Sequence, residues 1–534
     1  MSKASQVLLE TLRGFGVELV FGIPSVHNIG FYEAMREAGS VRHVLCRTEA
    51  GAVHMADGYA RTGRGLGVAV ASTGPGAGYT VAPLMEAWAS CSPVLVLNSN
   101  IASGRIGAGE GKLHEIPDQA SIFRSMTKAT FSPRSADEVG PTAREAATTA
   151  LTGRPGPVYL EVPVDLWDKE TGEGPGPPPD TAGPAGPSKG LAEAIERVRK
   201  ARRPVIVVGE DAGRAGLGPL VMALAERLGA PVVTETQAGG AVPADHPLVF
   251  GVAPRKGAIR ATLEEADLAL ALGTRLREAD IKRHGVHLAP LIHADWDETW
   301  MGRNYEPLVR LPGNLGTTLA GLLAGLETAP RPAWADKQSA LLKREIETAR
   351  ETHPVEMAYL KAIREALPRN GDLIVDNTQL GYWAEYFYPA YEPGGLTAAK
   401  GATILGFAFP AAMGRRLALP DRPLAALIGD GGFLYCAQEL ATCRRHGLGF
   451  PLIVVNDQAY GVIGYLQNLF YRQKYENALV NPDFVALAMA FGVSAVRVDS
   501  PEGLHEALVE ALSAQDMRLI ELAARFEEPP FRRY

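Results

Sequence analysis

Two apolar runs in the C-terminal third, each followed by an acidic residue, most constrain how this chain can fold. Residues 424–428 and 451–455 are predicted to form buried parallel strands, and residues 433–446 between them a helix. Asp430 and Asp457 follow the two strands. Ligands of an open parallel sheet bind at the carboxyl ends of its strands, so we expect the two carboxylates to converge there.

The residues around this acidic pair have the chemistry of a magnesium and diphosphate site. Gly429, Gly431 and Gly432 allow backbone amides to approach phosphate oxygens closely. Magnesium in proteins is usually held by one or two carboxylates together with substrate phosphates. Taken alone, Gly-Asp-Gly-Gly is equally compatible with an ordinary tight turn. The second acidic strand end at this distance favours the metal site.

The same segment resembles the signature of thiamine diphosphate enzymes of the acetolactate synthase and 2-oxo-acid decarboxylase superfamily. That signature is Gly-Asp-Gly followed, about one helix and one strand later, by Asn-Asn or Asn-Asp. The resemblance implies that Mg²⁺ is held by Asp430, Asp457 and the backbone carbonyl of Ala459. It also implies that thiamine diphosphate is bound by Gly429, Gly431, Gly432, Tyr460 and Gly461.

A chain of 534 residues is too long for one hydrophobic core. Breaks rich in Pro or Gly lie at 168–189 and 327–334. In each of the three parts that these breaks separate, strand-like runs such as 68–71, 94–97, 205–208 and 268–272 alternate with helical patterns, which predicts an α/β fold of three doubly wound parallel-sheet domains. The resemblance implies a pyrimidine-binding domain at 1–168, a central domain at 190–327 and a diphosphate-binding domain at 353–534.

Composition excludes several classes of protein. No run of about twenty apolar residues predicts a membrane span, and the N-terminus has no apolar signal segment, so we expect a cytoplasmic protein. A net charge of -7 without a long basic run argues against nucleic-acid binding. The four cysteines lack the spacing of zinc sites and are predicted to be buried free thiols, with Cys436 and Cys443 on one helix.

An N-terminal stretch resembles the segment that carries the activating glutamate of the family. It runs from Arg47 to Arg61 and begins Arg-Thr-Glu-Ala-Gly-Ala-Val-His-Met-Ala-Asp-Gly-Tyr. The resemblance implies that Glu49 hydrogen-bonds the pyrimidine ring and favours the tautomer that removes the thiazolium proton. Taken alone, a glutamate at a strand-to-helix junction is better explained as a capping acid. The length of the match favours the catalytic role.

Two more segments resemble parts of the family's cofactor cavity. Residues 400–412 match a glycine-rich strand-to-helix turn. The match implies that Leu405 is the apolar wedge that keeps the cofactor bent and that the carbonyl of Thr403 accepts from the pyrimidine amino group. Residues 72–78 resemble a Ser-Gly-Pro-Gly loop, which implies that Ser72 lines the same cavity. Core packing and a plain Gly-Pro turn are the alternatives.

Two histidines are candidates for proton transfer, because imidazole is the usual general acid or base near neutral pH. His114 stands where acetolactate synthases carry a glutamine, and His27 lies in the loop after the first predicted strand, which faces the cofactor in relatives. A purely structural histidine is the alternative for each.

The substrate end of the site gives mixed signals. Residues 467–484 resemble the acetolactate synthase segment that closes over the site, which favours carboligation. Ala279 replaces the arginine that binds a carboxylate in those enzymes. Pro-Ser-Val-His, Lys-Leu-His-Glu and Glu-x-Asp look closer to the 5-guanidino-2-oxopentanoate decarboxylase, in which Glu278 and Asp280 would face a cationic tail. The favoured alternative makes both solvated surface acids.

The resemblance therefore implies a thiamine diphosphate- and Mg²⁺-dependent enzyme that decarboxylates a 2-oxo acid without net oxidation. The resulting enamine is either captured by a second carbonyl, as in acetolactate synthase, or protonated to an aldehyde; the sequence leaves this open. It also leaves open FAD in the central domain and a regulatory subunit. The alternatives are a non-catalytic protein on this fold and a flavin-linked oxidase. The expected partner is a second copy of the chain, in a homodimer or homotetramer that shares its sites.

Overall fold

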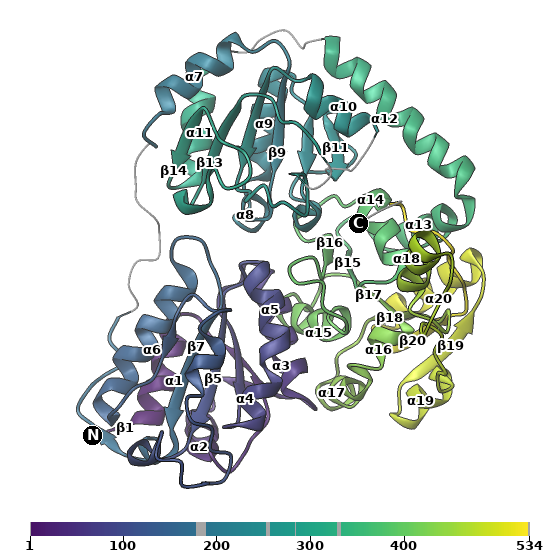
Figure 1. Cartoon of the computed structure of the whole chain (residues 1–534). Coiled ribbons are helices and arrows are strands. Elements are labelled where there is room, and N and C mark those ends of the chain that lie inside the picture. The colour runs from purple at the N-terminus through teal and green to yellow at the C-terminus, as the bar shows by residue number, and fades with distance from the viewer. Residues whose placement is uncertain (1, 178–187, 253–256, 283–284, 328–332, 532–534) are drawn as a thin grey trace.

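The computed structural model describes residues 2–177, 188–252, 257–282, 285–327 and 333–531. These residues form three parallel six-stranded sheets flanked by helices, which confirms the predicted α/β class (Figure 1). Within these ranges, no helix has the length and apolar character needed to cross a membrane. The two predicted breaks lie partly outside the described residues, so the domain boundaries stay predictions.

The N-terminal sheet has the strand order β3-β2-β4-β5-β7-β6. Its strands are β2 (Leu19–Gly22), β3 (Arg42–Leu45), β4 (Gly67–Ala71), β5 (Val94–Asn100), β6 (Thr130–Phe131) and β7 (Val158–Pro163). Its helices are α1 (Ala4–Gly14), α2 (Ile29–Ala38), α3 (Glu49–Ala60), α4 (Pro75–Tyr79), α5 (Val81–Ala89) and α6 (Ala136–Leu151). A short antiparallel pair, β1 (Ser2–Lys3) with β8 (Glu170–Thr171), ties down the chain start.

The central sheet has the order β11-β10-β9-β12-β13-β14. Its strands are β9 (Pro204–Val208), β10 (Val232–Thr234), β11 (Val249–Val252), β12 (Leu268–Leu272), β13 (Leu291–Asp295) and β14 (Val309–Pro312). Its helices are α7 (Leu191–Lys200), α8 (Glu210–Arg214), α9 (Gly218–Leu228), α10 (Ala258–Glu265) and α11 (Leu315–Gly325). The long helix α12 (Ala333–Thr352) leads to the next domain.

The C-terminal sheet has the order β16-β15-β17-β18-β20-β19. Its strands are β15 (Asp372–Val375), β16 (Leu396–Ala398), β17 (Leu424–Gly429), β18 (Pro451–Val455), β19 (Ser494–Val498) and β20 (Arg518–Leu522). Its helices are α13 (Pro354–Ala366), α14 (Gln379–Phe387), α15 (Ala408–Ala418), α16 (Asp430–Phe433), α17 (Leu440–His446), α18 (Gly461–Tyr471), α19 (Phe484–Ala490) and α20 (Pro501–Ala514).

The single helix predicted at 433–446 is wrong. The segment is divided into the end of α16, a 3₁₀ turn at Ala437–Glu439 and α17. Cys436 has φ -138° and ψ 8°, outside the α-helical range, so the helix is interrupted there. Cys436 and Cys443 therefore do not share one helix, although all four cysteines are buried and free as predicted.

In each sheet the chain returns past its first strand and continues on the other side, and a ligand crevice is expected at the carboxyl ends of the strands at that reversal. The reversals fall between β2 and β4, between β9 and β12, and between β15 and β17. The sequence motifs of the first and third domains follow these strands. The fold thus places the predicted site segments at the two crevices where the topology favours binding.

The N-terminal and C-terminal domains share one continuous core. Helices α3 and α15 lie side by side between the two sheets (Figure 1), and their buried residues belong to a single apolar cluster. A Cβ atom added to Gly58 would lie 2.1 Å from the carbonyl oxygen of Ala411, and one added to Gly414 would lie 1.9 Å from that of Met55. The helices therefore touch backbone to backbone, which only glycine permits here.

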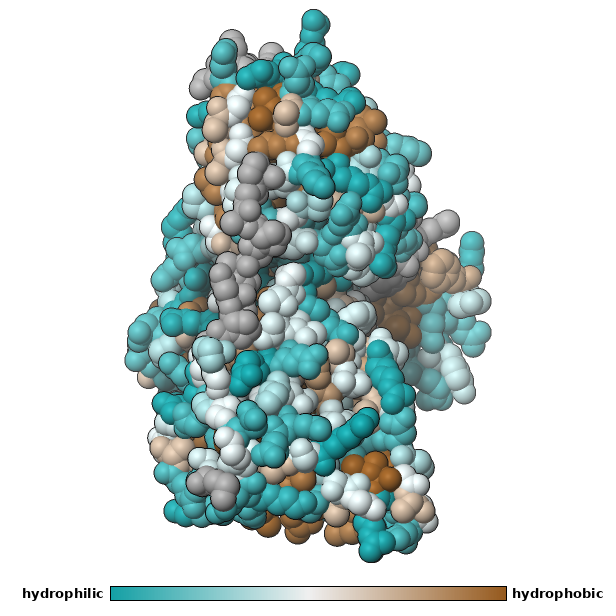
Figure 2. All heavy atoms as spheres, turned by 90° about the vertical axis from the view of Figure 1, so that its left-hand side faces the viewer, coloured by the Kyte–Doolittle hydropathy of each residue, from teal (hydrophilic) through white to brown (hydrophobic). Residues whose placement is uncertain are grey.

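The side of the molecule that carries α6 and α7 has a mostly hydrophilic surface (Figure 2). Apolar residues gather there in separate patches, the clearest of them on the central domain at the top of the view. Scattered apolar groups of this kind are normal for a water-exposed surface.

Candidate active site

A cavity of about 310 Å³ lies at the carboxyl edge of the C-terminal sheet, beside the reversal between β15 and β17. Every site residue that the sequence predicted in this domain lines it: Thr403, Leu405, Gly429, Asp430, Gly431, Gly432, Asp457, Ala459, Tyr460 and Gly461. The lining also includes residues that the sequence reasoning missed: Asn377, Thr378, Gln379, Tyr382, Val462, Ile463 and Leu466.

Two carboxylates form the acidic end of the cavity. Asp430 accepts hydrogen bonds from the Gly431 N–H (2.7 Å) and from Asn481 Nδ2 (2.7 Å). Burial raises the pKa of Asp430. Burial, and then the charge of Asp430, raise the pKa of Asp457 to about 6. A buried and a half-buried carboxylate that repel each other create a local negative field, which a cation would neutralise.

The donor set fits magnesium. No cluster of three His, Cys, Asp or Glu side chains suited to a metal occurs in the described part of the chain. An ion at the acidic pair would therefore complete its shell with carbonyl, water or ligand oxygens, as magnesium commonly does. Gln458 has φ +55°, and the Ala459 N–H donates to Asp457 Oδ1 (3.2 Å), so a tight turn presents the Ala459 carbonyl near the pair.

Two glycines of the cavity lie so close to neighbouring side chains that a Cβ atom would clash. A Cβ atom on Gly431 would lie 2.6 Å from the Tyr460 ring, and one on Gly461 would lie 2.6 Å from Asp457 Oδ2. Neither position accepts a side chain without rearrangement. The wall near Asp430 and Asp457 is therefore exposed backbone, which suits hydrogen bonds to phosphate oxygens.

Residues of the loop after β15 form hydrogen bonds to the turn before α15. Thr403 has φ +60°, a left-handed conformation that is strained for a β-branched residue, and Gly406 has φ +82°. Asp376 accepts from the Gly406 N–H (2.8 Å), and Asn377 Nδ2 donates to the Ile404 carbonyl (3.1 Å). Burial raises the pKa of Asp376 to about 6. The sequence signal was available, since this loop also follows an apolar strand of the same sheet.

The N-terminal domain presents the second group of predicted residues. Glu49 is the first residue of α3, and Thr48 Oγ1 caps the helix by accepting from the Gly51 N–H (2.9 Å). Glu49 is half-buried, and this burial raises its pKa. A Cβ atom on Gly76 would lie 2.8 Å from that of Ser72 and 3.4 Å from Glu49 Oε1. Ser72 and Glu49 therefore approach each other across Gly76.

The two candidate histidines lie together at the same edge. The ring centroids of His27 and His114 are 5.2 Å apart, and the Nδ1 atoms of both are buried without a hydrogen-bond partner. Burial, and then the charge of His114, lower the pKa of His27. A Cβ atom on Gly74 would lie 2.4 Å from the His114 carbonyl oxygen, so the segment of His114 packs on the Gly-Pro loop.

Sequence reasoning missed two residues that hold these segments. Gln119 is buried; its Oε1 accepts from the Gly74 N–H (2.7 Å), and its Nε2 donates to the Ser99 carbonyl (2.9 Å). Glu439, from the C-terminal domain, accepts from the backbone N–H groups of Arg47 (3.2 Å) and Thr48 (3.0 Å). A glutamine or glutamate gives no local sequence signal for such long-range contacts.

Within one chain the two groups of residues stay apart. The described lining of the 310 Å³ cavity comes wholly from residues 377–466 and includes none from the N-terminal domain. Large apolar side chains are exposed beside both groups: Val26 (62%), Ile29 (60%) and Leu113 (65%) flank the histidines, and Tyr435 (62%) and Tyr471 (79%) lie on the C-terminal domain. Each half therefore faces a surface that another chain could cover.

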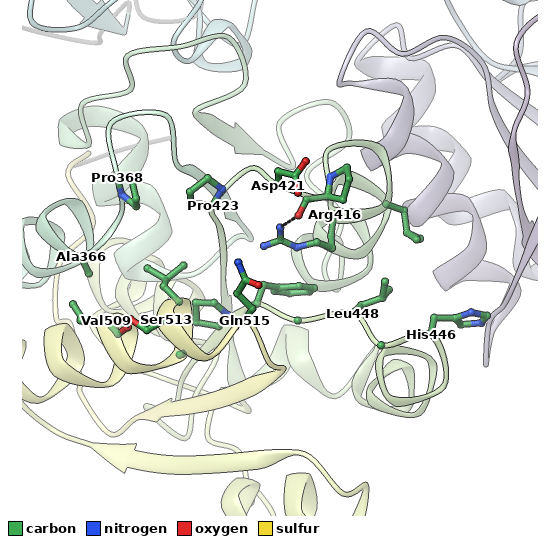
Figure 3. A pocket seen from close by; sticks show the side chains of 18 of the residues that line it. Ala366, Pro368, Arg416, Asp421, Pro423, His446, Leu448, Val509, Ser513 and Gln515 are labelled. Atoms are coloured by element: carbon green, nitrogen blue, oxygen red, sulfur yellow. Dashed lines mark hydrogen bonds between the residues drawn. The ribbon is translucent and has the colours of Figure 1, made fainter.

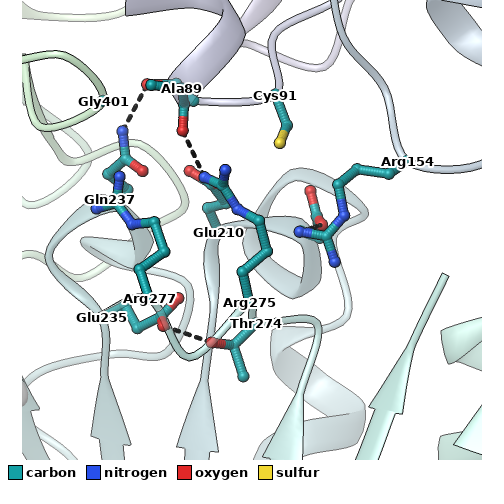
Figure 4. Close-up of polar contacts among 12 residues, drawn as sticks. Ala89, Cys91, Arg154, Glu210, Glu235, Gln237, Thr274, Arg275, Arg277 and Gly401 are labelled. Carbon is teal, nitrogen blue, oxygen red and sulfur yellow. Dashed lines mark hydrogen bonds and ion pairs between the residues drawn. The ribbon is translucent and has the colours of Figure 1, made fainter. Parts of the chain in front are cut away.

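Charged side chains gather at the carboxyl edge of the central sheet (Figure 4). Arg275 Nη2 lies 2.7 Å from Glu210 Oε1, and Arg277 forms hydrogen bonds of 2.7 and 3.0 Å to the carboxylate of Asp280. The side chain of Asp280 is only 8% exposed, so the prediction of a solvated surface acid is wrong for Asp280. Glu278 is exposed, as predicted.

Comparisons with known proteins agree with this geometry. Three family descriptions match: the thiamine pyrophosphate enzyme N-terminal TPP binding domain at residues 2–122, the central domain at 191–322 and the C-terminal TPP binding domain at 376–522. A probable 2-ketoarginine decarboxylase of Pseudomonas aeruginosa is 34% identical, covering 97% of this chain and 93% of that protein. A probable acetolactate synthase large subunit of Methanocaldococcus jannaschii is 31% identical, covering 97% and 91%.

A three-domain α/β architecture with TPP-binding domains at both ends defines a thiamine diphosphate enzyme. The chain belongs to the superfamily of acetolactate synthase and the 2-oxo-acid decarboxylases. An acetolactate synthase of Mycobacterium bovis, 30% identical over 97% of this chain and 87% of that protein, is a further relative.

Proposed function

We propose that the protein catalyses the thiamine diphosphate- and Mg²⁺-dependent decarboxylation of a 2-oxo acid, followed by carboligation to a second carbonyl compound. One observation carries the proposal: all the predicted diphosphate-domain residues line a single cavity around the carboxylates of Asp430 and Asp457. The names of the relatives support the reaction class, since they include acetolactate synthases and a 2-oxo-acid decarboxylase.

The residues present fit the cofactor and the ion. Asp430, Asp457 and the Ala459 carbonyl would hold Mg²⁺, and the backbone of Gly429, Gly431, Gly432, Tyr460 and Gly461 would hold the diphosphate. Thr403 and Leu405, on the strained turn before α15, would meet the two rings, while Glu49 and Ser72 would meet the pyrimidine. When bound, thiamine diphosphate supplies the thiazolium that serves as the electron sink for decarboxylation.

The chain's own groups would manage protons. Burial raises the pKa of Glu49, so its carboxyl group exchanges a proton more readily near neutral pH than an exposed glutamate does. Burial lowers the pKa of His27, so its ring is neutral at pH 7, and its unpaired Nδ1 can donate or accept, depending on the tautomer. We assign proton transfer at the substrate to His114, with His27 as the neighbour that relays the proton.

The separation of the N-terminal and C-terminal groups of site residues supports a site that is shared between two chains. Glu49 lies at the carboxyl edge of the N-terminal sheet and Asp430 at that of the C-terminal sheet. The cavity that Asp430 lines does not include Glu49 of the same chain among its described residues. The exposed apolar side chains beside both groups supply the contact area for a second copy. We therefore propose a homodimer as the smallest active unit, with a homotetramer as a larger form, in the cytoplasm.

The alternative product is an aldehyde. Ala279 stands where acetolactate synthases carry a carboxylate-binding arginine, and Arg277 is committed to Asp280, so neither provides a free anchor for an acceptor acid. The relative named as a 2-ketoarginine decarboxylase agrees with this outcome. Our proposal assigns no role to FAD.

A substrate panel tests the proposal. The pure protein is incubated with thiamine diphosphate, Mg²⁺ and pyruvate, 2-oxobutyrate, phenylglyoxylate or 5-guanidino-2-oxopentanoate, and both carbon dioxide and the organic product are followed by mass. Acetolactate from pyruvate supports carboligation, and an aldehyde from a larger acid supports the alternative. Asp430→Ala is the control without activity, and absence of carbon dioxide from every acid would contradict the proposal.

A further inference from the structure

A second and larger cavity lies at the opposite, amino edge of the C-terminal sheet (Figure 3). Its volume is about 620 Å³, and residues of the segments 366–368, 416–423, 446–451 and 509–515 line it. These segments, which include helix ends, precede β15, β17, β18 and β20. A strand of six residues spans about 20 Å, so the sheet separates this cavity from the candidate active site.

The size and lining suit a small organic molecule. Ligand cavities usually measure about 300–1,000 Å³ and are mostly apolar, with a few placed polar groups. Here the apolar part of the wall includes Leu417, Leu448, Phe450 and Leu512. Polar atoms take the larger share of this wall and apolar side chains the rest, so the lining offers both kinds of contact to a ligand.

Arg416 is the polar group that stands out. Its Nη1 donates to the carbonyls of Pro420 (2.6 Å) and Arg422 (2.9 Å), while its Nε is buried without a hydrogen-bond partner. Figure 3 shows the guanidinium pointing toward Gln515 over the middle of the cavity. Burial lowers the pKa of Arg416, since the charged form has lost part of its hydration. A half-buried cation in this state would be stabilised by an anion.

The neighbouring arginines make the contrast clear. Arg415 pairs with Asp372, at 2.5 Å, and Arg422 pairs with Asp372 (2.8 Å) and Glu392 (3.4 Å). Among the residues that the structure describes, Arg416 forms no ion pair with any carboxylate. The fold thus provides partners for the arginines on either side and leaves Arg416 directed at the cavity.

The other titratable groups of the wall leave a net attraction for anions. Arg42 is exposed at the rim. His446 Nε2 accepts from the Leu45 N–H (3.0 Å), and burial lowers its pKa, so it is neutral at pH 7. Asp421 is the acidic residue among the described lining; it is exposed and acts on Arg416 only through space. Two cations therefore face one carboxylate.

We propose that this cavity binds a small organic carboxylate, whose carboxylate group pairs with the Arg416 guanidinium. Two helices connect this cavity with the candidate active site, so a ligand bound here could influence that site. Helix α15 follows the turn of Thr403 and contains Arg416, and α17 follows Glu439, which accepts from the Thr48 N–H, and ends at His446. The binding site itself does not depend on the proposed reaction.

Ligand-observed NMR on the full chain, loaded with thiamine diphosphate and Mg²⁺, tests the proposal. The probes are short straight, branched and aryl carboxylates, each compared with its uncharged primary amide. At least one carboxylate is expected to bind while its amide does not. Arg416→Gln should weaken that binding about tenfold or more, because a charge-assisted hydrogen-bonded pair is lost. Arg416→Lys should retain part of it.

Two controls make the result decisive. Ser513→Trp fills the cavity without removing a charge and should abolish binding, whereas Arg369→Gln, which removes an exposed arginine paired with Asp245, should leave it unchanged. Arg416→Gln should keep the affinity of the wild type for thiamine diphosphate. Equal binding of acids and amides, no binding at all, or binding that survives both Arg416→Gln and Ser513→Trp would overturn the proposal.

Discussion

At the scale of single residues, burial decides what each carboxyl group can do. Glu49, Asp430 and Asp457 are acids whose pKa is raised by burial, and each lies at a carboxyl edge of a sheet. The pKa of Glu33, on α2, is instead lowered by the hydrogen bond to Arg36. Acidic residues thus differ in protonation according to where the fold places them.

Glu49→Gln tests the first of these acids. The amide keeps the shape of the side chain and its place at the start of α3 but holds no exchangeable acidic proton, so kcat should fall by about 10²–10⁴-fold. Binding of thiamine diphosphate, measured by titration calorimetry, should change little. Glu33→Gln is the matched control on the neighbouring helix and should retain full activity; a Glu49→Gln enzyme as fast as the wild type would remove Glu49 from the mechanism.

Glu235→Gln tests a buried acid outside the site. Thr274 Oγ1 donates to Glu235, and burial, followed by the charge of Asp280, raises the pKa of Glu235 from 4.5 to about 8. The folded state therefore favours the protonated form of Glu235. The stability that protonated Glu235 contributes is fully present below pH 4.5 and is lost as the pH rises through about 8. The variant should gain thermal stability relative to the wild type as pH increases over that range.

Scanning calorimetry of the two proteins between those pH values measures this effect. The difference in Tm should be near zero at the acid end and largest above pH 8. A constant difference across the range would mean that Glu235 stays ionised in the folded state.

Sequence patterns predicted residues well where a motif is local. The glycines and aspartates after β17 and β18 lie where the strand-end argument places them, because both depend on a few neighbouring residues. Gln119 and Glu439 escaped prediction because their partners are far away in sequence, and nothing near either residue indicates them. The pairing of Asp280 with Arg277 depends on burial, which the alternating charges there do not indicate.

At the scale of elements, the contact between α3 and α15 joins the N-terminal domain to the C-terminal domain. Helix α3 begins at Glu49, and α15 follows the turn of Thr403 and Leu405. The contact is built on Gly58 and Gly414, each against a backbone carbonyl of the other helix. Close packing of this kind tolerates no added volume.

Gly58→Ala is therefore expected to destabilise the protein by about 1–3 kcal/mol, since its methyl group would overlap the Ala411 carbonyl. The change should appear as a lower Tm. Gly172→Ala is the control, because a Cβ atom at Gly172 has no neighbour within 4 Å. Equal Tm values for the two variants would show that α3 and α15 can separate without loss.

Element prediction succeeded where strands are continuous apolar runs. The observed strands β12 and β18 match the predicted residues 268–272 and 451–455. It failed between 433 and 446, where the tertiary contact of Glu439 with the Arg47 and Thr48 backbone accompanies an interrupted helix. Local periodicity carries no information about a partner on another domain.

At the scale of the whole molecule, the two halves of the candidate site face outward from one chain. The resemblance to a known family supplied the expectation of a site shared between subunits, and periodicity alone could not have supplied it. The exposed aromatic side chains Tyr435, Tyr471 and Tyr475 lie on the C-terminal half and agree with a covered surface there.

Mixing two inactive variants tests the shared site. Glu49→Gln and Asp430→Ala each remove one half, so a mixed dimer contains one intact site and one with both defects. After subunit exchange, the mixture should recover up to about a quarter of wild-type activity, because random pairing makes half of the dimers mixed and each has one site. Activity that stays at the level of the separate variants would place both residues in one chain.

The glycine contact between α3 and α15 has a kinetic consequence if the site is shared. Each chain would give its N-terminal domain to one reaction centre and its C-terminal domain to the other, while α3 and α15 keep these domains from moving independently. A substrate that closes one centre would then alter the neighbouring centre through the same chain. Turnover would be a property of the pair, and the dependence of rate on substrate concentration would depart from a simple hyperbola.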